Sequence, residues 1–291
     1  MSGSAPAIAA PLNAMSVDVE DWFQVQAFAG LIEPGRWDAM PCRVEANMDR
    51  LLAAFDAAGV HATFFTLGWV AERYPQIVRA IVAGGHELAS HGQNHQLVHS
   101  LTPVEFRDDV VRAKDVLEQV GGVAVVGYRA PTFSIGPGNP WAWEVLEQTG
   151  HRYSSSLYPV RHDLYGAPDA PRTPHRPGTG ALVEIPMTTL PLGGRNLPIS
   201  GGGYFRLMPY PLFRTLLRRF HRQEHRAAMF YFHPWEIDPG QPRMAAAPRL
   251  ARFRHTVNLG AMAGRVDRLI RDFRWDRIDR AFAADLAQAE A

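Results

Sequence analysis

The chain has 291 residues, a formal net charge of +1 and 46% hydrophobic residues. At this length a folded chain buries about three quarters of the surface exposed by its unfolded form, so it needs no disulfide or structural metal. The single cysteine, Cys42, excludes an internal disulfide and a thiolate zinc cage. The near-neutral charge argues against nucleic-acid binding. The sequence has no apolar run of membrane-spanning length and no signal-peptide pattern, so a cytoplasmic protein is expected.

Short apolar strands alternate with amphipathic helices along the whole chain. The pattern predicts strands over residues 12–19, 61–67, 87–90, 123–128, 153–157, 182–187 and 228–233. It predicts helices over residues 43–58, 75–83, 103–120, 141–148 and 211–221, and a helical tail over 254–284. This alternation implies right-handed βαβ units and a parallel sheet. About seven repeats of the unit favour a barrel over an open sheet.

The chain is predicted to form one domain over residues 15–285, preceded by a flexible tail over residues 1–14. A helical extension of this domain begins near residue 250. The segment 159–180 is dense in Pro, Gly, Arg and His, which predicts a long surface loop. Loops of that length are often functional.

Four polar clusters lie at the ends of predicted strands, where a parallel α/β fold carries its reactive residues. The first cluster places Asp18, Glu20 and Asp21 at the end of the first strand. Strand alternation puts Asp18 and Glu20 on one face, with Asp21 at the turn. Crowded carboxylates repel each other, so an arginine or a metal ion is expected beside them. An acidic helix start is the plainer interpretation of the same pattern.

The second cluster contains two histidines four residues apart, His91 and His95. If this turn is helical, both imidazoles lie on one face and reach the same ion. Two histidines and one carboxylate leave positions for water and substrate, which is typical of a catalytic metal site. Surface histidines on a loop are the alternative.

The third and fourth clusters supply an arginine and a further histidine. Arg129 ends a predicted strand and precedes Pro131 by two residues, so it is a candidate to clamp a carboxylate. His233 follows the strand residues Phe230-Tyr231-Phe232, and Trp235 lies two residues after it. A histidine in this position is a candidate general acid, or a buried histidine with a purely structural role.

The order and content of these clusters resemble the polysaccharide deacetylases of carbohydrate esterase family 4, the NodB-homology enzymes. The likeness extends from about Met15 to about Asp279. Three segments are similar to the branch associated with exosortase/PEP-CTERM exopolysaccharide clusters: Val17–Val25, Gly201–Arg206 and Phe232–Asp238. The resemblance implies an α/β fold, a distorted (β/α)7 barrel, and removal of N-acetyl groups from the amino sugars of a polymer.

The resemblance also implies roles for individual residues. Asp18 would be the general base, Arg129 would orient it, and His233 would be the acid. His91 and His95 would bind a divalent metal, most commonly Zn²⁺, with Co²⁺ or Ni²⁺ as alternatives. The third ligand would be Glu20 or Asp21, with Glu20 favoured because it shares a face with Asp18. The residues expected to contact the sugar are Trp22, Pro131, Phe133, Tyr204 and Trp235, although core packing is the alternative for most aromatic residues.

The sequence departs from the family pattern at three points. The usual adjacent Asp-Asp is replaced by the sequence Asp18-Val19-Glu20-Asp21. Gly92 follows His91 where many members have Ser or Thr. Ser154 lies in a segment where many relatives carry Asp, so the usual carboxylate partner of His233 is either absent or supplied from elsewhere.

The expected function is therefore metal-dependent deacetylation of a bacterial exopolysaccharide, with an N-acetylated saccharide as the partner and the inner face of the membrane as one possible location. Two alternatives remain. One is a metal-independent hydrolase of cyclic amides on the same barrel, and the other is an inactive barrel that binds polysaccharide.

Overall fold

The computed structural model describes residues 11–287. Its strands are β1 (Leu12–Val19), β2 (Thr63–Thr66), β3 (Glu87–Ser90), β4 (Gly127–Tyr128), β5 (Tyr153–Ser154), β6 (Val183–Glu184), β7 (Thr189–Leu192), β8 (Arg195–Pro198), β9 (Met229–Phe232) and β10 (Arg274–Asp276). Its α-helices are α1 (Val44–Ala58), α2 (Gly68–Arg73), α3 (Pro75–Ala83), α4 (Pro103–Gly121), α5 (Trp141–Gln148), α6 (Gly202–Leu207), α7 (Tyr210–Glu224), α8 (Arg249–Thr256), α9 (Leu259–Asp272), α10 (Ile278–Ala281) and α11 (Ala283–Ala287). Short 3-10 helices cover Gln26–Phe28, Pro34–Ala39, Val98–Ser100, Pro131–Phe133 and Pro234–Ile237.

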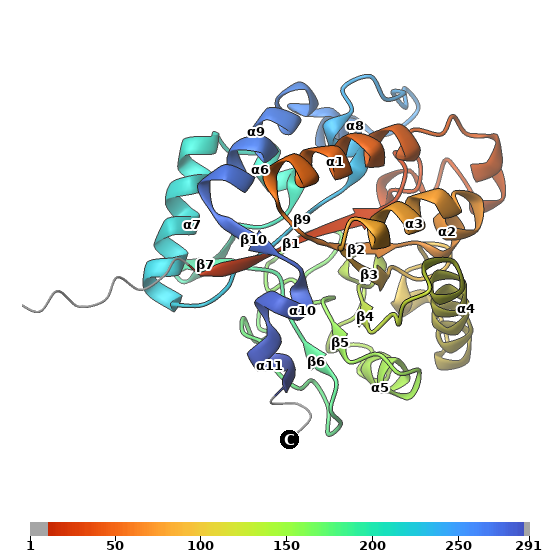
Figure 1. The fold of residues 1–291 in the computed structure, drawn as a ribbon, viewed down its shortest axis with the longest axis horizontal. Helices are drawn as coiled ribbons and strands as arrows, with labels where there is room; N and C mark the ends of the chain where they lie inside the picture. Colours follow the sequence, from red (N-terminus) through yellow and green to blue (C-terminus); the bar gives the residue numbers. More distant parts are fainter. Residues whose placement is uncertain (1–10, 288–291) are drawn as a thin grey trace, which may run out of the picture.

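Seven parallel strands curl into a barrel in the order β9-β1-β2-β3-β4-β5-β6. The helices lie around the outer side of this curled sheet (Figure 1). Within residues 11–287 no strand pairing joins β6 to β9, so the barrel is open at that seam. Strands β7 and β8 form a separate antiparallel hairpin. The predicted (β/α)7 barrel is confirmed in this distorted, open form.

Side chains of β1 point alternately to the two faces of the sheet, so one strand contributes both to the apolar core and to the polar end of the barrel. Met15, Val17 and Val19 belong to the apolar layer packed beneath the helices. Ala14 belongs to the cluster that fills the barrel interior. Successive side chains point to opposite faces of a strand. Asp18 therefore points to the same side as Ala14, at the carboxyl end of the barrel.

Two predictions at the chain ends are wrong. The predicted tail 1–14 includes the first residues of β1, since Leu12–Ala14 pair with β10; residues 1–10 lie outside the described range. The predicted helical tail is interrupted by β10, because Trp275 is buried and its indole Nε1 donates to Leu269 O at 2.9 Å. The folded domain therefore begins before residue 15, and its organisation as a single domain stays a prediction. No helix among the described residues is both long and apolar enough to cross a membrane.

The side chain of Glu87 is buried at the amino ends of the parallel strands, opposite the ends that carry Asp18. Glu87, the first residue of β3, accepts hydrogen bonds from the hydroxyl groups of Thr63 and Tyr153. Burial raises the pKa of Glu87 to about 7, despite these hydrogen bonds. The folded protein therefore keeps this carboxyl protonated over a pH range in which the unfolded chain ionises it.

This difference in the pKa of Glu87 between the folded and unfolded states makes the free energy of unfolding depend on pH. Because the folded pKa is raised, the stabilisation from the protonated Glu87 is fully present below the ordinary pKa of 4.5 and is lost as the pH rises through about 7. We expect urea unfolding to show a loss of about 3 kcal/mol between pH 4.5 and pH 8 that Glu87→Gln removes. An equal pH dependence in the wild type and the variant would contradict this expectation.

Candidate active site

A cavity of about 460 Å³ lies at the carboxyl ends of the parallel strands. Side chains from β1, from the loop after β3 and from the turn after β9 meet in it. The predicted site residues that line it are Asp18, Glu20, His91, His95, Phe133, Tyr204, His233 and Trp235. Residues more than 200 positions apart in sequence are therefore neighbours here.

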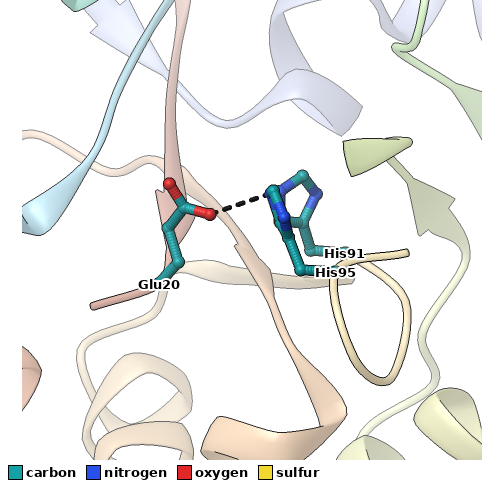
Figure 2. A group of neighbouring side chains, drawn as sticks. All are labelled: Glu20, His91 and His95. Carbon is teal, nitrogen blue, oxygen red and sulfur yellow. Dashed lines mark ion pairs between the residues drawn. The ribbon is translucent and has the colours of Figure 1, made fainter. Parts of the chain in front are cut away.

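Glu20, His91 and His95 form a cluster whose ligand atoms all lie within 4.8 Å of one another. Figure 2 shows the Glu20 carboxylate facing the two imidazoles. Glu20 Oε2 lies 2.9 Å from His95 Nε2. Within residues 11–287 this is the only group of three or more His, Cys, Asp or Glu side chains that is arranged to hold a metal ion.

The protonation states and contacts of this cluster fit a divalent cation. His91 Nδ1 lies 2.8 Å from Arg129 O, which leaves Nε2 as the free ligand atom, an arrangement common among metal-binding histidines. Burial lowers the pKa of His91 to about 4, so its imidazole is neutral. Burial would raise the pKa of Glu20, but the three nearby histidines outweigh it and lower this pKa to about 2. Glu20 Oε2 is buried without a well-aligned hydrogen-bond donor, as expected of an oxygen that binds a cation.

Asp18 is held by a buried arginine. Arg129 Nη1 donates to Asp18 Oδ1 at 2.6 Å and to Ser16 Oγ at 2.9 Å. Its other nitrogens donate to the carbonyl and hydroxyl oxygens of Ser155, both at 3.1 Å. The guanidinium also lies 4.0 Å from the centre of the Phe65 ring. These contacts fix the arginine, which in turn fixes the orientation of the Asp18 carboxylate.

His233 faces Asp18 and Glu20 and is supported from behind by another carboxylate. Its Nε2 lies 4.0 Å from Asp18 Oδ2 and 3.5 Å from Glu20 Oε1. Its Nδ1 lies 2.8 Å from Glu236 Oε1, and the buried Arg206 Nε donates to Glu236 Oε2 at 2.7 Å. Burial would lower the pKa of His233, but Glu20, Glu236 and Asp18 outweigh it and raise this pKa to about 9.

Glu236 also explains the glycine at the first position of α6. A Cβ added at Gly202 would lie 2.1 Å from Glu236 Oε1, so no larger side chain fits there. Gly201 has a φ of +90°, a backbone conformation that glycine adopts readily. Gly202 therefore gives Glu236 room to reach His233.

The structure separates the two candidates for the third ligand. Glu20 joins the histidines, and Asp21 does not. Asp21 Oδ2 accepts hydrogen bonds from the backbone N–H groups of Arg43 and Val44, at 2.7 and 3.0 Å. It therefore anchors the first turn of α1, where a carboxylate is favoured by the unpaired N–H groups.

Two residues that were expected to contact the sugar, Trp22 and Pro131, do not line the cavity. Trp22 is 1% exposed, and its indole Nε1 donates to Pro41 O at 3.1 Å, so it packs in the core. Pro131 is buried and does not line the cavity. The plainer interpretation, core packing, is the correct one for Trp22. Trp235 lines the cavity and stacks on His233, with ring centroids 5.2 Å apart.

The turn between the two histidines is not helical. Residues 91–97 form a loop, with Gly92 and His95 in left-handed conformations at φ of +77° and +53°. Asp109 stabilises the loop by accepting the backbone N–H of Gln93 at 2.9 Å. The imidazoles still converge, with ring centroids 5.3 Å apart.

Three supporting residues were missed by the sequence analysis: Ser155, Arg206 and Glu236. Glu236 is the carboxylate partner of His233 that the serine at position 154 does not provide. A sequence signal for it exists, because His-Pro-x-Glu places the glutamate three residues after the histidine, as in a capping box. No comparable local pattern marks Arg206, which lies 30 residues away.

Two family models match adjacent parts of the chain. Residues 36–154 match Polysaccharide deacetylase, and residues 155–283 match Domain of unknown function (DUF3473). The chain is 28% identical over 113 residues to a peptidoglycan deacetylase of Helicobacter pylori, covering 39% of this chain and 38% of that protein. It is 31% identical over 125 residues to a chitooligosaccharide deacetylase of Bradyrhizobium sp., covering 43% and 51%. The chain thus spans between a third and about half of the length of these curated relatives.

Solved structures share the fold over nearly the whole chain. One, from Mycobacterium smegmatis and provisionally named a polysaccharide deacetylase, has a TM-score of 0.62 at 22% identity, covering 98% of this chain and 93% of that one. The peptidoglycan deacetylase PdaC from Bacillus subtilis has a TM-score of 0.51 at 13% identity, covering 97% and 95%. Residues 36–154 therefore match a polysaccharide deacetylase domain. The whole chain shares the fold of the solved deacetylase structures, which is the fold of the NodB-homology enzymes.

The boundary between the two family models runs through the candidate site. His91, His95 and Arg129 lie in the first match, and His233, Glu236 and Arg206 lie in the second. Asp18 and Glu20 precede both matches. Strand β5 ends at the last residue of the first match, and it pairs with β4 in that match and with β6 in the second. The region of unknown function therefore supplies β6 and β9, the two strands that flank the open seam of the barrel, and the His233 side of the cavity.

Proposed function

We propose that this protein is a metal-dependent hydrolase that removes N-acetyl groups from the amino sugars of a polysaccharide. The observation that carries the proposal is the meeting of Asp18, the Glu20–His91–His95 cluster and His233 in one cavity. A base, a cation site and an acid are the groups that hydrolysis of an unactivated amide requires.

A divalent cation held by Glu20, His91 and His95 would polarise the acetyl carbonyl and lower the pKa of water. Asp18, oriented by Arg129, accepts a proton as water adds to the carbonyl carbon. His233 donates a proton to the departing amine nitrogen, which leaves poorly as an anion. The products are acetate and the free amino sugar. In the turn after β4, Phe133 N–H already donates to Ala130 O at 3.1 Å, so the Thr132 N–H remains for the developing oxyanion.

Zinc is the metal that we propose. Two imidazole nitrogens and one carboxylate oxygen with open positions are typical of catalytic zinc sites, and Co²⁺ or Ni²⁺ suits the same donors. Phe133, Tyr204 and Trp235 line the cavity and would contact the sugar rings. The three segments similar to the exosortase/PEP-CTERM branch support an exopolysaccharide as the substrate.

The test is acetate release from N-acetylglucosamine oligomers by metal-loaded protein, with and without a chelator. We expect release that stops when the metal is removed and returns when it is restored. Hydrolysis of cyclic amides by metal-free protein would support the first alternative instead. Oligosaccharide binding without turnover at any metal would support the inactive, polysaccharide-binding alternative.

Glu236→Gln is expected to lower kcat by about 10- to 100-fold, because the variant loses the charge that orients His233 and favours its protonated form. Glu236 raises the pKa of His233, so its loss should move the high-pH limb of the kcat profile to lower pH. The matched control is Glu224→Gln, which removes a carboxylate paired with Arg172 outside the cavity. An unshifted limb in Glu236→Gln would contradict the role given to Glu236.

A further inference from the structure

Helix α8 has two faces of different character. On the inner face, Ala251, Arg254 and His255 line the cavity. On the outer face, Leu250 and Phe253 are 54% and 53% exposed. These two residues are three apart, which places them side by side on a helix surface. Helix α8 therefore forms part of the cavity wall with one face and exposes Leu250 and Phe253 to solvent on the other.

Further exposed apolar side chains surround the same opening. Leu164, in the loop after β5, and Leu207, at the end of α6, are each 50% exposed, and both line the cavity. Single exposed apolar residues are common on protein surfaces, but several gathered at one site indicate a contact with another surface. Leu164, Leu207, Leu250 and Phe253 come from three separate segments, so helical amphipathicity alone does not explain them.

The charged residues of the segment that contains α8 are all positive, and one acidic side chain from outside it, Asp163, pairs with Arg254. Residues 239–266 include five arginines and no aspartate or glutamate. Arg254 pairs with Asp163, and Arg265 donates to backbone carbonyls of α6. Arg243, Arg249 and Arg252 are exposed. Arginines that flank exposed Leu and Phe on a short helix are typical of segments that lie in the interface of an anionic bilayer.

We propose that the docking face, defined as Leu164, Leu207, Arg249, Leu250, Arg252 and Phe253, binds the surface of an anionic lipid bilayer. The apolar side chains enter the headgroup boundary, and Arg249 and Arg252 face the lipid charges. The cavity then opens toward the bilayer. This inference concerns binding alone and does not depend on the proposed hydrolysis.

The test is co-sedimentation of the full chain with vesicles of phosphatidylcholine alone or with added phosphatidylglycerol. We expect binding only to the anionic vesicles, and weaker binding as salt increases. Arg249→Gln with Arg252→Gln should weaken binding by about 25-fold, at roughly fivefold for each charge. Leu250→Ser with Phe253→Ser should weaken it by at least about tenfold, since both side chains lose their apolar contact.

The matched control is Val104→Ser with Leu192→Ser, two exposed apolar residues outside the docking face, which should leave binding unchanged. Circular dichroism should show that every variant is folded. Three outcomes would overturn the proposal: no binding of the wild type to anionic vesicles, equal binding to neutral vesicles, or unchanged binding of both α8 variants. Loss of vesicle binding with intact acetate release would separate this proposal from the proposed function.

Discussion

Glu20→Gln is expected to abolish stoichiometric metal binding and to lower acetate release by roughly 10³-fold or more. Glu20 is the only anionic member of the cluster that it forms with His91 and His95. Glutamine keeps the shape of the side chain and removes the charge. Two neutral imidazoles alone hold a divalent ion weakly, because the ion has lost its anionic ligand.

Metal content per protein, measured after dialysis, tests this expectation directly. The matched control is Asp21→Asn, which changes the neighbouring carboxylate and should keep the metal, because Asp21 binds the start of α1 and not the cluster. A full metal complement in Glu20→Gln, or metal loss confined to Asp21→Asn, would refute the assignment of Glu20.

Asp18→Asn is expected to lower kcat by about 10³-fold while leaving metal binding intact. The asparagine can still accept a hydrogen bond from Arg129, but it cannot take a proton from water. The change also leaves the buried guanidinium without its carboxylate, so we expect a stability loss of about 3–5 kcal/mol.

Kinetics and metal analysis of the same preparation separate these effects. Thermal unfolding identifies the temperature at which the variant is fully folded, and acetate release is compared there. Activity within tenfold of the wild type, with full metal content, would show that Asp18 is not the base. Loss of the metal together with activity would show that Asp18 helps to bind the cation.

The fold was largely predictable because its strands and helices have strong local patterns. The helix 75–83 and the strand 87–90 agree with α3 and β3 residue for residue. Strand β10 was missed because it has three residues and directly follows the amphipathic helix α9. Its pairing with Leu12–Ala14 depends on a contact some 260 residues away in sequence, which no local pattern reports.

The candidate site was partly predictable for a similar reason. Strand alternation favoured Glu20 over Asp21, and the structure places Glu20 beside the histidines. Trp22 was misplaced because an aromatic residue beside an acidic cluster fits a binding site and a core equally well in sequence. Arg206 was missed because its role is visible only once α6 lies against the turn after β9.

Continuity of the sheet across β5 has a practical consequence for anyone who expresses pieces of this chain. Residues 36–154 alone would lack β1, β9 and β6, and would leave the flanks of β2 and β5 as open edges. Exposed edges of this kind recruit other strands, so such a fragment should precipitate or form mixed oligomers. Fragments cut at the boundary between residues 154 and 155 would therefore not report the function of the carboxyl-terminal half.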